Sequence, residues 1–116
     1  MRKVLFVEDE NALRKSYERY FDGRYAMAFA GTGSEGLRRL GEVTPDVLVL
    51  DLRLPDTDGI ALLQTIRQTH PTLPVIVTTA YVSMEPLMGV LDLAHSAYLV
   101  KPFDLNELGA RIDAAG

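Results

Sequence analysis

The chain contains no cysteine and no tryptophan among its 116 residues, and only 8% of them are aromatic. The absence of cysteine excludes disulfides, thiolate metal sites and cysteine nucleophiles, and it is typical of a reducing compartment. Long apolar runs are also missing. The first, Val4–Val7, ends at Glu8 and is too short for a signal-peptide core or a membrane span. These absences predict a cytoplasmic protein without a membrane role.

Clustered positive charge is lacking too. The net charge is -4, and the basic residues form no run longer than a pair such as Arg38-Arg39. Binding to a phosphate backbone needs clustered Lys and Arg, so we expect no direct nucleic-acid binding. What the chain does have is 47% hydrophobic and 24% charged residues, at the length of one ordinary domain. We therefore expect residues 1–116 to form one globular domain.

Apolar runs of four to six residues alternate along the chain with segments of helical periodicity. This alternation is typical of βαβ units, in which helices cover both faces of a parallel sheet. The expected strands are Lys3–Val7, Tyr25–Ala30, Val47–Asp51, Val75–Thr79 and Ala97–Lys101. The third and fourth are apolar at nearly every position, which indicates central strands buried on both faces. Right-handed crossovers then favour the strand order 2-1-3-4-5, with the topological switch between strands one and three.

The segments between and after the strands carry apolar residues at helical spacing. The stripes expected to face the sheet are Leu13, Tyr17, Tyr20 and Phe21; Leu37 and Leu40; Gly59, Leu62, Leu63 and Ile66; Leu87, Leu91 and Ala94; and Leu105, Leu108 and Ile112. Asp58 is positioned to cap the third helix. The fourth is expected to begin at Ser83–Pro86, and Asp104–Glu107 resembles a capping box for the fifth.

Polar residues follow the apolar runs where the predicted strands end. They are Glu8 and Asp9, Asp51, Thr79 and Lys101. The carboxyl ends of parallel strands lie on one edge of the sheet, so these residues are expected to meet in one crevice.

The chemistry of that crevice favours a hard divalent cation. Three neighbouring carboxylates raise one another's pKa unless a cation compensates their charge. Carboxylate and carbonyl oxygens suit Mg²⁺, and neither histidine lies at a strand end, which makes zinc improbable. Asp51 can attack phosphorus as an anion to form an acyl phosphate. Lys101 and Thr79 can then neutralise and orient the transferred oxygens.

Five motifs in order resemble the receiver domain of two-component response regulators. They are Glu8-Asp9; Asp51-Leu52-Arg53-Leu54-Pro55; Gly59; Thr79-Ala80; and Tyr98-Leu99-Val100-Lys101-Pro102-Phe103. The resemblance covers essentially the whole chain. It implies a flavodoxin-like (βα)5 fold, doubly wound around a five-stranded parallel sheet. It also implies a stoichiometric phosphoacceptor that is not an enzyme beyond its own phosphorylation and dephosphorylation.

The resemblance also implies particular roles. Glu8, Asp9, Asp51 and the carbonyl of Arg53 would bind Mg²⁺, with Asp51 as phosphoacceptor and Lys101 and Thr79 as phosphoryl-sensing residues. Tyr98 would be the aromatic switch partner of Thr79, although an aromatic residue in a strand is as readily explained by packing. A cis peptide bond before Pro102 is implied as well. The expected partners are a sensor histidine kinase or phosphotransfer protein, an output domain or downstream protein in transcription regulation, and a phosphorylation-dependent second copy.

Some positions depart from the family pattern. Glu8 stands where Asp is commonest, and Ser96-Ala97 replaces an often acidic pair before Tyr98. Arg53 and Tyr81 occupy the two positions that control water access to the phosphoryl group in the family. Both are large, so we expect them to shield Asp51 and prolong its phosphorylation.

Three other functions are compatible with parts of the pattern. A hydrolase of the haloacid-dehalogenase type needs a second Asp two residues after the nucleophile, where this chain has Arg53. A flavodoxin-like nucleotide binder needs a phosphate-cradling first loop, which Glu8-Asp9-Glu10 would repel. The serious alternative is a receiver-like protein-interaction module that is never phosphorylated.

Overall fold

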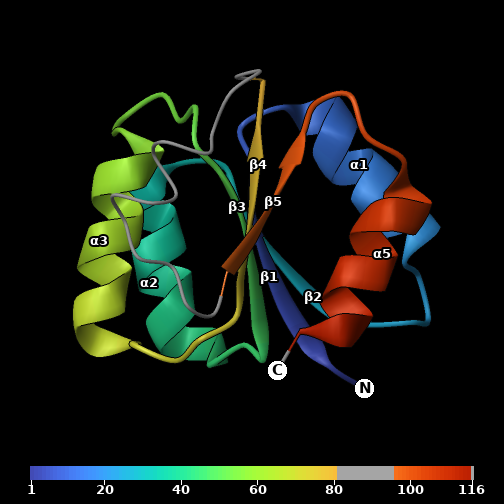
Figure 1. Cartoon of the computed structure of the whole chain (residues 1–116), viewed down its shortest axis with the longest axis horizontal. Helices are drawn as coiled ribbons and strands as arrows, with labels where there is room; N and C mark the ends of the chain where they lie inside the picture. The colour runs from blue at the N-terminus through green and yellow to red at the C-terminus, as the bar shows by residue number, and fades with distance from the viewer. Residues whose placement is uncertain (81–95, 116) are drawn as a thin grey trace.

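The computed structural model describes residues 1–80 and 96–115 and has three layers, with a parallel sheet between two pairs of helices (Figure 1). The strands are β1 (Lys3–Val7), β2 (Ala26–Ala30), β3 (Val47–Asp51), β4 (Val75–Thr79) and β5 (Ser96–Val100). The helices are α1 (Asn11–Tyr20), α2 (Gly33–Val43), α3 (Gly59–Thr69) and α5 (Leu105–Ala114). The strand order is β2-β1-β3-β4-β5, as predicted, and every pairing is parallel.

Strand β3 is the central strand and β4 lies beside it, and both faces of these two strands are covered. All five residues of each are buried. The predicted strand bounds are correct within one residue, the differences being at the start of β2 and at both ends of β5. The predicted fourth helix near Ser83–Pro86 lies outside the described residues. No helix in the described part of the chain is long and apolar enough to cross a membrane.

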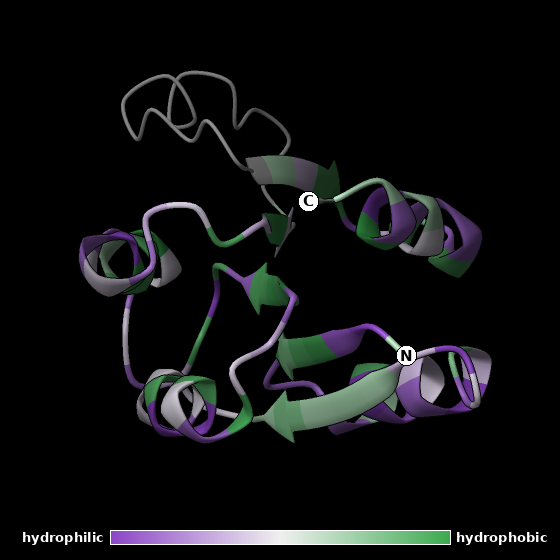
Figure 2. Ribbon diagram, turned by 90° about the horizontal axis from the view of Figure 1, so that it is seen from below, coloured by the Kyte–Doolittle hydropathy of each residue, from purple (hydrophilic) through white to green (hydrophobic). Residues whose placement is uncertain are grey.

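The two faces of the sheet are packed with different side chains. Helices α2 and α3 cover one face, where the core is aliphatic, with Leu50 and Leu63 fully buried. Helices α1 and α5 cover the other, where Phe6, Tyr17 and Phe21 stack in an aromatic cluster. Figure 2, viewed at right angles to Figure 1, shows the strands lying between the two helical layers. The chain thus has two hydrophobic cores, one on each face of the sheet, and the carboxyl ends of the strands lie between them.

Two expected core residues are instead exposed, and both corrections follow from helix geometry. Tyr20, 45% exposed, lies at one margin of the α1 stripe and buried Phe21 at the other. The two rings meet edge-on, with their centroids 4.9 Å apart. Leu37 is 40% exposed because the inner face of α2 consists of Gly33, Gly36 and Leu40. A Cβ on Gly36 would lie 3.0 Å from a methyl of Val7. The glycines therefore bring α2 close to the sheet and turn Leu37 outward.

The remaining local predictions concern the caps and the inner stripes of α3 and α5. Asp58 caps α3 as expected, since its Oδ1 accepts a hydrogen bond from the amide of Ile60 at 3.1 Å. Asp104 is the N-cap residue of α5, but its side chain makes no capping hydrogen bond within the described structure, so the predicted capping box is wrong. The predicted inner stripes of α3 and α5 are confirmed, with Leu105 only partly buried.

Candidate phosphoacceptor site

The carboxyl ends of β1, β3 and β5 bring three charged side chains into direct contact. The ammonium of Lys101 donates to Glu8 Oε1 at 2.9 Å and to Asp51 Oδ2 at 3.1 Å. These carboxylates come from positions 93 and 50 residues away in sequence. Both are almost fully buried, Glu8 being 1% and Asp51 2% exposed. The edge of the sheet therefore holds a buried cluster of opposite charges.

Asp9 completes an acidic group with Glu8 and Asp51. One carboxylate oxygen from each of the three residues lies within 4.8 Å of the others. Asp9 is exposed, so the group is open to solvent on its side. A cavity of about 200 Å³ opens there, lined by Asp9, Glu10, Asp51, Arg53, Ala80 and Lys101. Its small size suits an ion and a phosphoryl group better than a drug-sized molecule.

The pKa values in this cluster reflect burial and mutual charge. Burial raises the pKa of Glu8 to about 7; the hydrogen bond from Lys101 opposes this shift and the Asp51 carboxylate reinforces it. Burial alone would lower the pKa of Lys101, but the hydrogen bond to Glu8 and the charge of Asp51 outweigh it, and the pKa is raised. Lys101 is therefore held as a cation among carboxylates that it cannot fully neutralise.

Backbone contacts fix the loop after β1. The amide of Glu8 donates to the Ala30 carbonyl at 2.9 Å, and the Arg14 guanidinium donates to the Glu8 carbonyl at 2.6 Å. Glu8 Oε2 also accepts from the amide of Glu10, the N-cap residue of α1, at 3.2 Å. The side chain of Glu8 thus contacts both the helix start and Lys101. The role of Arg14 was not predicted; its only signal in the sequence is its position on the helix that follows the acidic pair.

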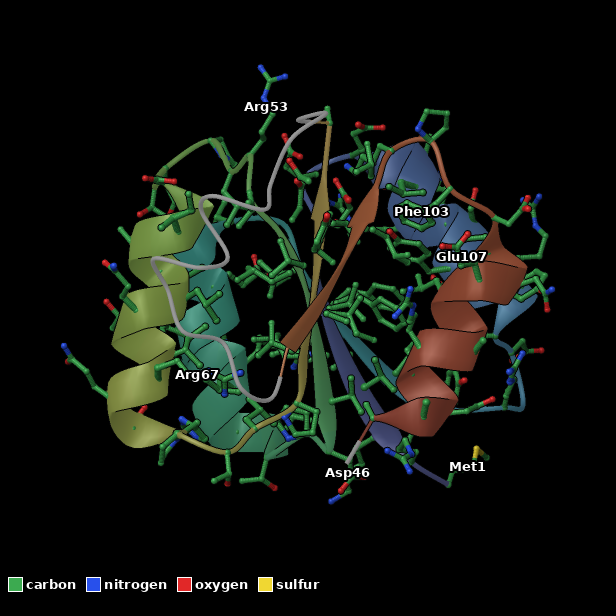
Figure 3. The ribbon with its side chains drawn as sticks, in the orientation of Figure 1. Met1, Asp46, Arg53, Arg67, Phe103 and Glu107 are labelled. Atoms are coloured by element: carbon green, nitrogen blue, oxygen red, sulfur yellow. The ribbon has the colours of Figure 1, made fainter. Side chains whose placement is uncertain are left out.

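Arg53 takes part through its backbone. Its amide donates to Asp51 Oδ1 at 3.0 Å and fixes the orientation of that carboxylate. Its side chain is exposed and points away from the body of the protein (Figure 3). Arg53 lines the cavity, but no hydrogen bond within the described residues holds its side chain over Asp51, so the expected shielding stays a prediction. The other expected shielding residue, Tyr81, lies outside the described residues.

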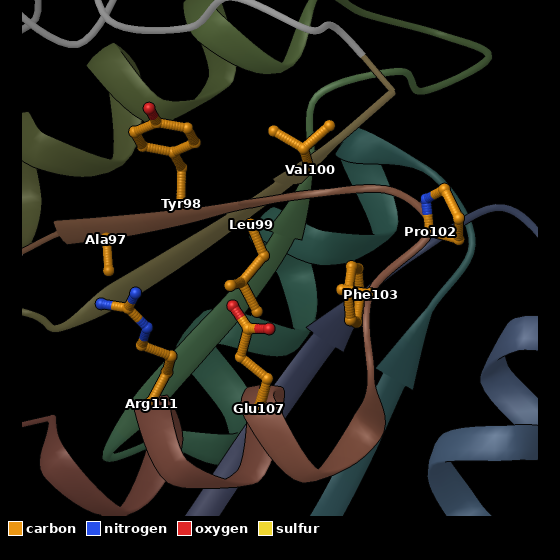
Figure 4. A pocket seen from close by; sticks show the side chains of 8 residues that line it. All are labelled: Ala97, Tyr98, Leu99, Val100, Pro102, Phe103, Glu107 and Arg111. Atoms are coloured by element: carbon orange, nitrogen blue, oxygen red, sulfur yellow. The ribbon is translucent and has the colours of Figure 1, made fainter.

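The two expected switch residues lie on neighbouring strands. Thr79 is fully buried at the end of β4, and its carbonyl accepts a hydrogen bond from the amide of Lys101 at 2.6 Å. Tyr98 is half-buried against the aliphatic core, on the opposite side of β5 from Leu99 and Glu107 (Figure 4). The Lys101–Pro102 peptide bond is cis, as the resemblance implies. Thr79 and Lys101 are thus joined directly through the backbone, whereas Tyr98 also serves as a packing residue.

The donor set at this edge fits Mg²⁺. It consists of carboxylate oxygens, some buried and one exposed to water, and this cation combines such ligands with several of its own waters. One ammonium faces three carboxylates, so added positive charge would relieve their repulsion. The structure thus brings together the side chains of Glu8, Asp9, Asp51 and Lys101. Arg53 and Thr79 join them through their backbones, and Tyr98 lies farther back on β5.

Comparison with known proteins identifies the chain. Residues 4–113 match the family model of the response regulator receiver domain. The chain belongs to this family. It is 39% identical over 119 residues to the DNA-binding transcriptional regulator NtrC of Escherichia coli, covering 97% of this chain and 24% of that protein. It is 40% identical over 114 residues to the response regulator MprA of Mycobacterium leprae, covering 97% of this chain and 50% of that protein.

A solved structure gives the same result for the fold of this receiver domain. The receiver domain of the Francisella response regulator 1452 superposes with a TM-score of 0.87 at 31% identity, covering 97% of this chain and 94% of that one. The chain spans only a quarter to a half of the NtrC and MprA sequences that it matches.

Proposed function

We propose that this receiver domain accepts a phosphoryl group on Asp51, with Mg²⁺ as cofactor, from a sensor histidine kinase or phosphotransfer protein. The observation that carries the proposal is the setting of Asp51, a buried carboxylate at the wall of a small cavity. Lys101 holds one of its oxygens and the Arg53 amide holds the other. A carboxylate fixed in this way beside a cation is prepared for attack on phosphorus.

The transfer needs little from the protein beyond position and charge. A carboxylate oxygen of Asp51 forms the new P–O bond while the P–N bond of the donor's phosphohistidine breaks, and the electron pair returns to the imidazole. Lys101 neutralises charge on the phosphoryl oxygens, and the buried Thr79 orients one of them. Glu8, Asp9, Asp51 and the Arg53 carbonyl would hold Mg²⁺, which when bound supplies further charge neutralisation at the phosphoryl group. No separate base is required, because Asp51 reacts as an anion.

The proposed consequence is a change of conformation that another protein recognises. Thr79 and Tyr98 would shift together when the phosphoryl group engages Lys101 and Thr79. The domain would act stoichiometrically in the cytoplasm, with no enzymatic turnover beyond its own phosphorylation and dephosphorylation. The partners would be an output domain or downstream protein and a second, phosphorylated copy. The similarity to NtrC, a DNA-binding transcriptional regulator, supports transcription control as the output.

The experiment is mass spectrometry of the intact protein after incubation with acetyl phosphate and Mg²⁺. We expect the addition of one phosphoryl group to the wild-type protein and none to Asp51→Asn, which keeps the shape of the side chain. Addition at full yield in Asp51→Asn would contradict the choice of residue. No addition to the wild-type protein would favour the alternative, a receiver-like interaction module that is never phosphorylated.

A further inference from the structure

Asp56 lies in the loop between β3 and α3 and binds the start of a different helix, α2. Its Oδ1 accepts from the amide of Gly33 at 2.7 Å, and its Oδ2 accepts from the amide of Ser34 at 3.0 Å. Both amides belong to the first turn of α2, where backbone donors lack partners within the helix and favour an anion. These two hydrogen bonds lower the pKa of Asp56.

The contact between loop and helix does more than cap α2. The helix has a cap of its own, because the Thr32 hydroxyl accepts from the amide of Glu35 at 3.1 Å. The loop also packs tightly on the helix start, since a Cβ added to Gly33 would lie 2.4 Å from the methyl group of Thr57. Asp56 and Thr57 together therefore fasten the loop to α2.

The two ends of the same loop, next to β3 and next to α3, are bonded to each other. Arg53 and Asp58 form an antiparallel bridge, and the amide of Gly59 donates to the Leu52 carbonyl at 3.0 Å. A Cβ on Gly59 would lie 2.4 Å from the Cα of Leu52, so this closure has no room for a side chain. A displacement of the loop at Asp56 would therefore be transmitted to the backbone of Arg53.

We propose that Asp56 is a positioning residue of the phosphoacceptor site, holding the loop so that the Arg53 amide orients Asp51 and the Arg53 carbonyl would be available to Mg²⁺. The path runs from α2 through Asp56 and the bridged loop to the hydrogen bond between the Arg53 amide and Asp51 Oδ1. Asp56 itself is not among the residues that line the cavity at Asp51. This inference rests on the proposed function, because it assigns Asp56 a task at that site.

The test compares Mg²⁺ affinity, measured by calorimetry, in Asp56→Ala and in a matched control, Thr32→Ala. Each variant removes side-chain acceptors from the first turn of α2, but only Asp56→Ala also releases the loop. We expect Mg²⁺ to bind Asp56→Ala about tenfold more weakly, at the low end of the effect of residues that support metal ligands. We expect Thr32→Ala to lose thermal stability while keeping the wild-type affinity. Asp56→Asn, which keeps one acceptor, should lie between Asp56→Ala and the wild type.

A second variant disturbs the same contact from the side of the helix. Gly33→Ala should improve helix propensity but push against Thr57. The added Cβ would also lie 3.2 Å from Asp56 Oδ1. We expect the variant to weaken Mg²⁺ binding and slow phosphorylation by acetyl phosphate, even though it lies outside the site and does not replace Asp56. This variant also keeps the test decisive if Asp56→Ala fails to fold.

The possible results separate the two proposals. Wild-type affinity for Mg²⁺ in Asp56→Ala and Gly33→Ala would overturn the positioning role and leave the proposed function intact. Equal weakening in Thr32→Ala would also overturn it, because the effect would then come from α2 alone. If the wild-type protein neither binds Mg²⁺ nor accepts phosphoryl, the proposed function fails and the positioning role fails with it.

Discussion

Two clusters of opposite charges in this protein differ in burial and in balance. At the carboxyl edge of the sheet, Lys101 contacts Glu8 and Asp51, whose side chains are only 2% and 3% exposed. On the aromatic side, Arg24 in the loop after α1 contacts Asp113 of α5 at 2.6 Å, with side chains 40% and 52% exposed. The Tyr25 hydroxyl donates to the same carboxylate at 2.6 Å.

The exposed cluster is balanced in charge, and it is explained as a structural link between the loop after α1 and helix α5. One cation meets one carboxylate, and the Arg24 guanidinium also lies over the rings of Phe21 and Tyr25 at 5.7 and 5.3 Å. The buried cluster is unbalanced, since the Lys101 ammonium contacts Glu8, Asp51 and, at 3.8 Å, Glu10, while Asp9 lies beside Glu8 and Asp51. Excess buried negative charge costs stability, and a bound cation would relieve that cost. The imbalance, more than the number of contacts, therefore indicates the functional cluster.

The largest expected effect comes from removing the Lys101 ammonium from the buried cluster. In the absence of divalent metal, Lys101→Met should lower the free energy of unfolding by about 3 kcal/mol, because buried carboxylates lose their partner. The matched change in the exposed cluster, Arg24→Met, should cost much less stability, since solvent screens that pair. Urea unfolding measures both. Equal losses in the two variants would contradict the distinction between the clusters.

Mg²⁺ should stabilise the protein by relieving the excess negative charge of the buried cluster. At ten times its dissociation constant the gain is about 1.4 kcal/mol. In a domain of this size the melting temperature should rise by roughly 5 °C. Asp9→Ala should lose most of this shift, whereas Asp113→Ala in the exposed cluster should retain it. A shift of the same size in Asp9→Ala would count against the metal site.

The smallest expected effect concerns the exposed cluster and its dependence on pH. Hydrogen bonds from Tyr25 and then Arg24 hold the pKa of Asp113 below its ordinary value of 3.8. The folded state therefore favours the ionised carboxylate, and the resulting stability is present above about pH 4 and is lost as the pH falls through the lowered pKa. Tyr25→Phe should reduce stability at pH 7 by less than about 1 kcal/mol, because Asp113 is exposed.

Stability curves of the wild type and Tyr25→Phe, measured from pH 7 down to acid, check this expectation. The difference between them should shrink as Asp113 is protonated. A difference that stays constant across the acid range would mean that the Tyr25 hydroxyl stabilises the fold independently of the charge on Asp113.

The sequence was sufficient to predict the sheet and the meeting of its polar strand ends. Buried strands leave a strong apolar pattern, and parallel topology fixes where residues such as Asp51 and Lys101 must lie. Periodicity was less reliable at the margins of helices. It predicted burial for Leu37, but the glycine-lined face of α2 sits so close to the sheet that Leu37 turns outward. Spacing alone does not reveal which part of an apolar stripe the tertiary packing selects.

The contacts that support the site were not predictable from local pattern. Arg14 reaches the Glu8 carbonyl across the loop after β1, and Asp56 binds α2 across more than twenty residues of sequence. Asp56 lies between the predicted third strand and third helix, and that position does not reveal that its side chain binds α2. Such contacts depend on where two loops lie in space, and nothing in the residue types specifies that.

The most direct test of the central claim is to locate the phosphorylated residue by chemical trapping. Borohydride reduces an acyl phosphate on aspartate to homoserine, which peptide mass spectrometry can assign to a position. After treatment with acetyl phosphate and Mg²⁺, the account predicts homoserine at position 51 alone, and none when Mg²⁺ is chelated. Homoserine at position 9 or 56, or equal trapping at position 51 without Mg²⁺, would contradict it.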